Sequence, residues 1–173
     1  MDEIFELLKY TLPALLVLLA SVFTLMIIFR NEEKKRKLEL QNSYKDTTLP
    51  LRLQAYERMI LFLERISPES LVMRVARTDV TSSQMQSELI SAVRIEFDHN
   101  LAQQVYLSSK AWEAVKIARA NVIKLINDSA SELKPEAAGM SLNKRLLEKM
   151  MELKSSPIEA AVEYLKKEVK ELF

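Results

Sequence analysis

The sequence has no cysteine and, among 173 residues, a single glycine, Gly139, and a single histidine, His99. Without cysteine there is no disulfide, thiolate zinc site, iron–sulfur cluster or cysteine nucleophile. One glycine is too few for a phosphate-binding loop, a dinucleotide fingerprint or a G-x-S-x-G elbow. These absences exclude several large classes of enzyme.

The same scarcity of glycine bears on the fold class. Sheet proteins depend on turns, and tight turns depend on glycine and on Asn-Gly or Asp-Gly pairs. The chain is instead rich in Leu, Ala, Glu, Lys, Met and Gln, which lose little rotamer freedom in a helix. We therefore expect an all-α protein.

One long hydrophobic run is present near the N-terminus. Residues 10–29 contain no charge, and a helix of 20 residues is about 30 Å long, enough to cross the hydrocarbon core of a bilayer. A buried core helix and a cleavable signal peptide are the alternatives. The preceding segment is acidic, with only Lys9 as a base, and no A-x-A-like cleavage site follows. We expect a retained transmembrane helix.

Basic residues gather directly after this run, and they are Arg30, Lys34, Lys35, Arg36 and Lys37. Flanking Lys and Arg stay on the cytoplasmic side, so the rule predicts the N-terminus outside and the C-terminus inside. The same five residues can contact anionic lipid headgroups. We expect a single-pass membrane protein whose C-terminal domain lies in the cytoplasm.

Three regions are predicted: residues 1–30 as the N-terminal tail and transmembrane helix, 31–47 as a charged helical stalk, and 48–173 as a cytoplasmic bundle of about five helices. The stalk should end at Asp46–Thr48, with Pro50 restarting a helix. Further helix starts are expected at Ser67-Pro68, at Thr81 with Gln84, at Ser108 and at Ser156-Pro157.

Two helices show a clear apolar stripe. The first should cover residues 82–107, and its stripe is Met85, Leu89, Ala92/Val93, Phe97, Leu101 and Val105. The second should cover residues 110–133, and its stripe is Ala111, Val115, Ala118, Val122 and Leu125.

Charge in the soluble part is balanced, with 19 basic and 19 acidic residues from residue 38 onward. Nucleic-acid binding usually needs a positive field that neutralises phosphates. We expect no nucleic-acid partner.

The segment around His99 is the one unusual polar cluster. Four polar side chains fall on one helical face: Glu96, His99, Asn100 and Gln103. Glu-x-x-His is half of a di-iron motif, but the second histidine is missing, and a zinc site fails for the same reason. We expect no metal and no cofactor. The face is either a hydrogen-bonded polar network or a surface that binds a partner.

The chain resembles a known family at three segments: LPLRLQAYER at residues 49–58, FLERISP at 62–68 and EFDHNLAQQ at 96–104. This is an uncharacterised family of small single-span membrane proteins from Bacteroidota. The resemblance covers most of the chain, up to about Asn127, and implies a bacterial inner membrane. It offers no activity or site residues.

Three functions remain open. The first is an interaction or scaffold protein that docks a protein partner or its own copies. The second is an accessory subunit of a larger membrane complex, in which the small residues Ala14, Ala20 and Ser21 would let the span pack against other helices. The third is an enzyme that uses carboxylates alone. We favour the first and expect no enzymatic activity.

Overall fold

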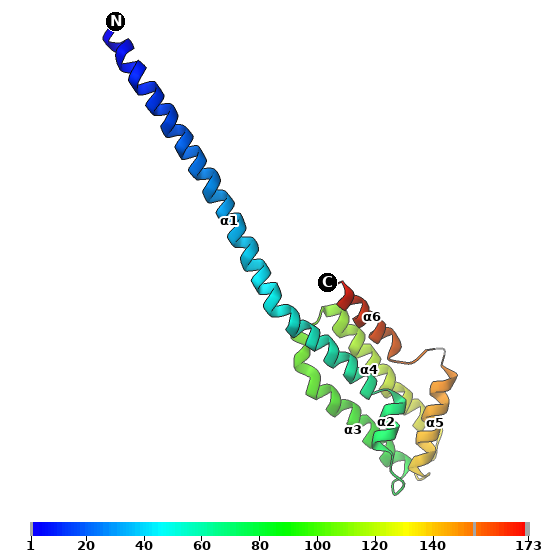
Figure 1. The fold of residues 1–173 in the computed structure, drawn as a ribbon. Helices are drawn as coiled ribbons and strands as arrows, with labels where there is room; N and C mark the ends of the chain where they lie inside the picture. Colours follow the sequence, from blue (N-terminus) through cyan, green and yellow to red (C-terminus); the bar gives the residue numbers. More distant parts are fainter. Residues whose placement is uncertain (1, 154, 172–173) are drawn as a thin grey trace. The chain divides into compact units, whose positions relative to one another are not determined.

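The computed structural model describes residues 2–153 and 155–171, with their side chains except those of residues 2–14 and 37–47. The described chain is helical, as expected from its composition (Figure 1). It divides into two compact units, Met1–Thr48 and Leu49–Phe173.

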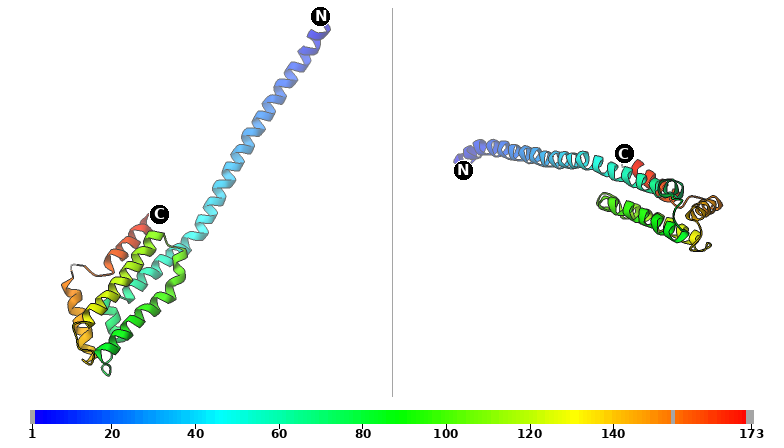
Figure 2. Two further views of the ribbon diagram at one scale, coloured as in Figure 1. Left: turned by 180° about the vertical axis from the view of Figure 1, so that it is seen from behind. Right: turned by 90° about the horizontal axis from the view of Figure 1, so that it is seen from below.

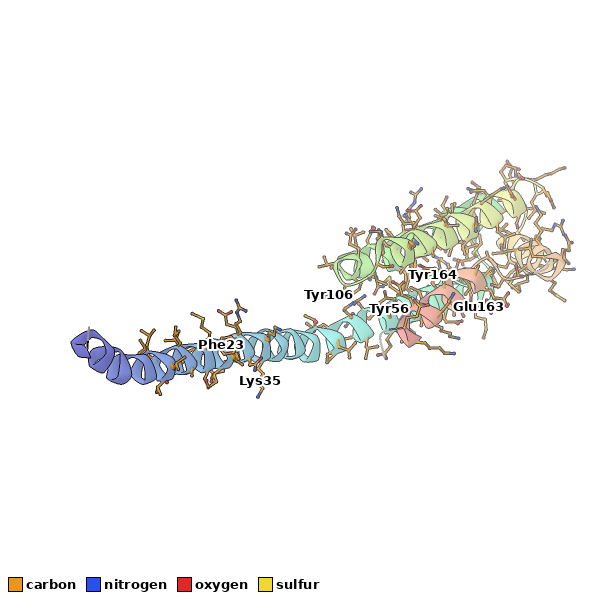
Figure 3. All side chains as sticks on the ribbon, turned by 90° about the horizontal axis from the view of Figure 1, so that it is seen from above. Phe23, Lys35, Tyr56, Tyr106, Glu163 and Tyr164 are labelled. Atoms are coloured by element: carbon orange, nitrogen blue, oxygen red, sulfur yellow. The ribbon has the colours of Figure 1, made fainter. Side chains whose placement is uncertain are left out.

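The first unit consists of the N-terminal part of helix α1 (Asp2–Arg65). Within it, residues Leu15–Arg36 are long and apolar enough to cross a membrane by length and composition, and none of that window is buried. Phe23, for example, is 67% exposed and projects from the helix, as does Lys35 (Figure 3). The earlier part of the expected span and Lys37 lie outside the described side chains.

Helix α1 continues through Pro50, so the predicted end at Asp46–Thr48 is wrong. A proline inside a helix cannot donate the usual hydrogen bond to the carbonyl four residues earlier, and its ring crowds that carbonyl. Together these effects can kink or break the helix. The residues on either side keep the helical pattern here, and the single lost bond does not end it.

The second unit is a helical bundle made of the end of α1, α2 (Pro68–Val75), α3 (Ser82–Asn100), the 3-10 turn η1 (Leu101–Val105), α4 (Ser109–Ala130), α5 (Gly139–Glu152) and α6 (Glu159–Lys170). Helix α4 packs against α3, α5 and α6, and α3 also packs against α2 and α5 (Figure 2).

Three of the predicted helix starts form as expected. The side chains of Ser67, Thr81 and Ser108 each accept a backbone N–H at the start of a helix, and Thr81 with Gln84 makes a complete capping box. The start at Ser156 is displaced, because α6 begins at Glu159. Ser156 Oγ instead accepts the N–H of Ile158 at 3.5 Å.

One continuous core fills the bundle. It includes the whole predicted stripe of α4, together with Tyr56, Phe62 and Leu63 from α1 and Leu165 from α6. The predicted stripe of α3 is right from Met85 to Phe97 and wrong beyond it. Helix α3 ends at Asn100, so the turn η1 leaves Leu101 42% and Val105 77% exposed.

Candidate functional site

Glu96, on α3, forms ion pairs with residues of two other helices. Its carboxylate pairs with Arg65 Nε at 3.0 Å and with Arg74 Nη1 at 3.8 Å, and its side chain is only 15% exposed. Arg65 ends α1 and Arg74 lies in the last turn of α2, while Glu96 lies on α3. This part of the predicted polar face is therefore an ion-pair network within the bundle.

Glu96, His99 and Asn100 also line a surface groove of about 450 Å³ between α1 and α3, together with Arg58, Leu61 and their neighbours. His99 is exposed, and Asn100 Nδ2 donates to the carbonyl of Glu96 at 2.8 Å. Gln103 does not line this groove. It lies on η1, because α3 ends before it.

The basic residues after the apolar stretch are exposed where the structure describes them, namely at Arg30, Lys34, Lys35 and Arg36. A row of exposed cations beside exposed apolar side chains suits the boundary between lipid tails and headgroups. Lys37, the fifth residue of this set, lies outside the described side chains.

A second groove, which the sequence did not single out, runs between α3 and α4. We call it the basic groove. It has a volume of about 450 Å³, and it is lined by Arg94 from α3 and by Lys116, Arg119, Ala120, Ile123, Lys124, Asn127 and Asp128 from α4. Four cations thus face one carboxylate. The spacing of Lys116, Ala120 and Lys124 on α4 was a readable signal, but Arg94 joins them only because the two helices pack side by side.

Arg119 is fixed in this groove by an aromatic cluster. Its guanidinium carbon lies 4.2 Å from the centroid of the Phe97 ring. Phe97 in turn stacks on Trp112, with centroids 5.3 Å apart, and meets Phe62 at 5.8 Å.

A third groove, of about 610 Å³, lies between α2 and α6 and has the opposite charge. It is lined by Glu64, Glu69, Glu159 and Glu163, with Lys166 as its cation. From residue 38 onward the basic and acidic residues are equal in number, but these two grooves separate the charges.

Tyr56 lies on α1 and is buried on the side that faces α6 (Figure 3). Its hydroxyl lies near the backbone of Ser108 and the side chains of Arg52 and Glu168, but it completes a hydrogen bond with none of the described residues. Burial raises the pKa of this phenol, and the charge of Glu168 adds to the effect.

The described side chains include no group of three or more His, Asp or Glu residues that converge as metal ligands do. The basic groove and the groove between α2 and α6 each offer charge that is mostly of one sign on a packed helical surface. Such surfaces bind partners of opposite charge and orient them.

Comparison with protein families adds one finding. The model of a family of unknown function, DUF7935, matches residues 2–172. The chain belongs to the DUF7935 family. Neither the curated proteins nor the solved structures include a match to it. Because the family match covers α1 through α6, membership concerns the apolar helix as well as the bundle.

Proposed function

We propose that this DUF7935 chain is a membrane-anchored interaction protein, which docks a protein partner, or a second copy of itself, close to a bacterial inner membrane. The observation that carries this proposal is the stretch Leu15–Arg36, a helix long enough to span a bilayer, whose described side chains are exposed. Exposed apolar surface of this extent needs lipid or another protein.

The polar groups within this stretch support a lipid environment. Ser21 Oγ donates to the carbonyl of Val17 at 2.8 Å, and Thr24 Oγ1 donates to that of Ala20 at 2.7 Å. Both hydroxyls are thus satisfied inside the helix, as a hydrocarbon environment requires. The exposed cations from Arg30 to Arg36 support a cytoplasmic bundle.

Anchoring is tested by carbonate extraction of bacterial membranes. We expect the wild type and a Leu18→Ile/Val22→Ile control to stay in the pellet at the full-length mass. Leu18→Arg/Val22→Arg should release the protein, since each arginine at mid-span costs about 3 kcal/mol. A soluble wild type, or one shortened by cleavage, would overturn the anchor.

Orientation is tested with single cysteines, which the cysteine-free sequence makes unambiguous. In spheroplasts, a membrane-impermeant maleimide should label Asp2→Cys. It should label Ser155→Cys only after the membrane is opened. The reverse pattern would place the bundle outside.

Docking is tested by mild-detergent pull-down with mass spectrometry, against an unrelated single-span protein as control. A lone monomer under several growth conditions would contradict the docking role. A second variant has the span replaced with an unrelated apolar helix. If the partner is still recovered, the span is a plain anchor; if the partner is lost, the span packs against other helices as in an accessory subunit.

A further inference from the structure

Most of the cations that line the basic groove form no ion pair inside the bundle. Arg94, Arg119 and Lys124 form no ion pair with any residue whose side chain the structure describes, and Lys116 pairs only with the exposed Glu113 on its own helix. By contrast, Arg65, Arg74, Arg77 and Arg145 all pair with acids. Three cations without an ion-pair partner in one groove produce a positive potential, which attracts anions.

Arg119 is the most informative of these cations. Its Nε atom is buried, yet it has no hydrogen-bond acceptor among the described residues. Because this Nε atom is covered, an incoming carboxylate would pair with the guanidinium through its other N–H groups. The stack on Phe97 holds the guanidinium in place, so little side-chain entropy remains to be lost on binding.

The groove also has an apolar strip. Ala120 is small, and Ile123, one turn further along α4, packs partly against the core. From Lys116 to Lys124 the groove extends along two turns of α4, or about 12 Å. At one end of the groove, Gln86 Nε2 donates to Asn127 Oδ1 at 2.8 Å, next to Asp128. Cations that flank an apolar strip match a helix with one apolar side chain between acids.

We propose that the basic groove docks an acidic, amphipathic helical segment of a protein partner, about two turns long. The inference deepens the proposed docking function and rests on it. It assigns the partner's carboxylates to Arg94, Arg119 and Lys124 and its apolar side chain to the strip at Ala120 and Ile123.

The first test measures peptide binding to the full chain in phosphatidylcholine nanodiscs. The probe is a fluorescein-labelled helical peptide with glutamates four residues apart around a leucine, and its control has lysine for glutamate. We expect only the acidic peptide to bind, and more weakly at 200 mM than at 50 mM NaCl. Arg94→Glu/Lys124→Glu should weaken binding about tenfold or more.

A matched control reverses two exposed lysines outside the groove, Lys110→Glu/Lys167→Glu, and should change binding by less than about twofold. Thermal melting shows whether each variant folds, and Arg94→Gln/Lys124→Gln repeats the test with a milder change. Equal binding by the wild type and both groove variants overturns the proposal. So does binding of phosphatidylglycerol vesicles through the same residues without binding of the peptide.

The second test separates this inference from the proposed function. The pull-down is repeated with Arg94→Glu/Lys124→Glu, and a photo-crosslinking residue at Ala120 maps the bound segment. Loss of a wild-type partner, with crosslinks to an acidic segment, supports the groove. A partner retained by the variant overturns the groove and keeps the docking function. No partner with the wild type overturns the docking function, while the peptide still tests the groove.

Discussion

Tyr56 makes the stability of the bundle sensitive to alkaline pH. Because burial raises its pKa above the ordinary 10.0, the unfolded chain loses this proton at lower pH than the folded chain does. Its contribution is therefore complete below about pH 10 and is lost as pH rises through the folded-state pKa. We expect Tyr56→Phe to flatten the fall in melting temperature between pH 9 and 11.

The same substitution should change stability at pH 7 by less than about 1 kcal/mol, since the hydroxyl completes no hydrogen bond. Tyr106→Phe, at an exposed tyrosine, is the control and should leave the alkaline profile unchanged. If the melting temperatures of the wild type and Tyr56→Phe fall in parallel between pH 9 and 11, another group causes the loss of stability at alkaline pH.

Gly139 begins α5 where two chain segments come close together. Its N–H donates to the carbonyl of Val80 at 2.9 Å, and a Cβ there would lie 3.0 Å from that oxygen and 3.2 Å from Met85 Cβ. Alanine favours a helix over glycine by about 1 kcal/mol. Crowding against backbone should outweigh this gain, so we expect Gly139→Ala to cost about 1–3 kcal/mol in chemical denaturation. Ser141→Ala, at an exposed position on the same helix, is the control. If Gly139→Ala proves more stable than the wild type, the added Cβ is not crowded.

Between helices, Glu96 and His99 should behave differently although they lie on one face of α3. Glu96→Gln leaves Arg65 and Arg74 without their carboxylate, and we expect a loss of about 1–2 kcal/mol. His99→Ala removes an exposed ring and should change stability by less than about 0.5 kcal/mol. Urea unfolding measures both. Equal effects would mean that His99 belongs to the network.

A second ion-pair network joins Glu132, just after α4, to Arg145 and Lys149 on α5. This network is weakened at acid pH. Hydrogen bonds from Arg145, at 2.6 Å, and from Lys149 lower the pKa of Glu132. Its contribution is present above the ordinary value of 4.5 and is lost as pH falls through the lower folded-state pKa. We expect Glu132→Gln to lower the melting temperature at pH 7 and to reduce its fall between pH 5 and 3. Glu136→Gln, an exposed neighbour, should do neither.

Three of the predicted helix starts could be read from the sequence because a cap is local chemistry. Ser67, Thr81 and Ser108 each need only the next three residues to act. Helix ends were harder. No glycine or proline marks Asn100, so the sequence offered no reason to end α3 there, and Leu101 and Val105 were assigned to a core that they do not reach.

The candidate sites depended on pairings that spacing along the chain does not reveal. Glu96 was visible as part of a polar face, but its partner Arg65 lies 31 positions earlier, so its structural role was hidden. The basic groove needs α3 beside α4 to bring Arg94 to Lys116 and Lys124. Balanced overall charge concealed it, since charge counts carry no positions.

In the chain taken together, the exposed apolar stretch and the buried core are formed by different residues. Among the residues whose burial the structure describes, the buried core runs from Ala55 to Leu165 and so lies in the unit Leu49–Phe173. The described side chains from Leu15 to Arg36 add nothing to that core, because they are exposed. The stability of the bundle should therefore not depend on residues 1–48.

A truncated chain of residues 49–173 tests this separation. We expect it to be soluble without detergent and to melt cooperatively within about 5 °C of the full chain, a shift of about 1 kcal/mol or less. Residues 49–157 form the matched control, since they lack Ala161, Val162 and Leu165 of α6, which pack in the core against α4. This shorter chain should lose the cooperative transition, because burying such side chains contributes about 1.5–3 kcal/mol each for the larger ones. If residues 49–173 aggregate or melt without a transition, residues 1–48 contribute to the fold as well as to the anchor.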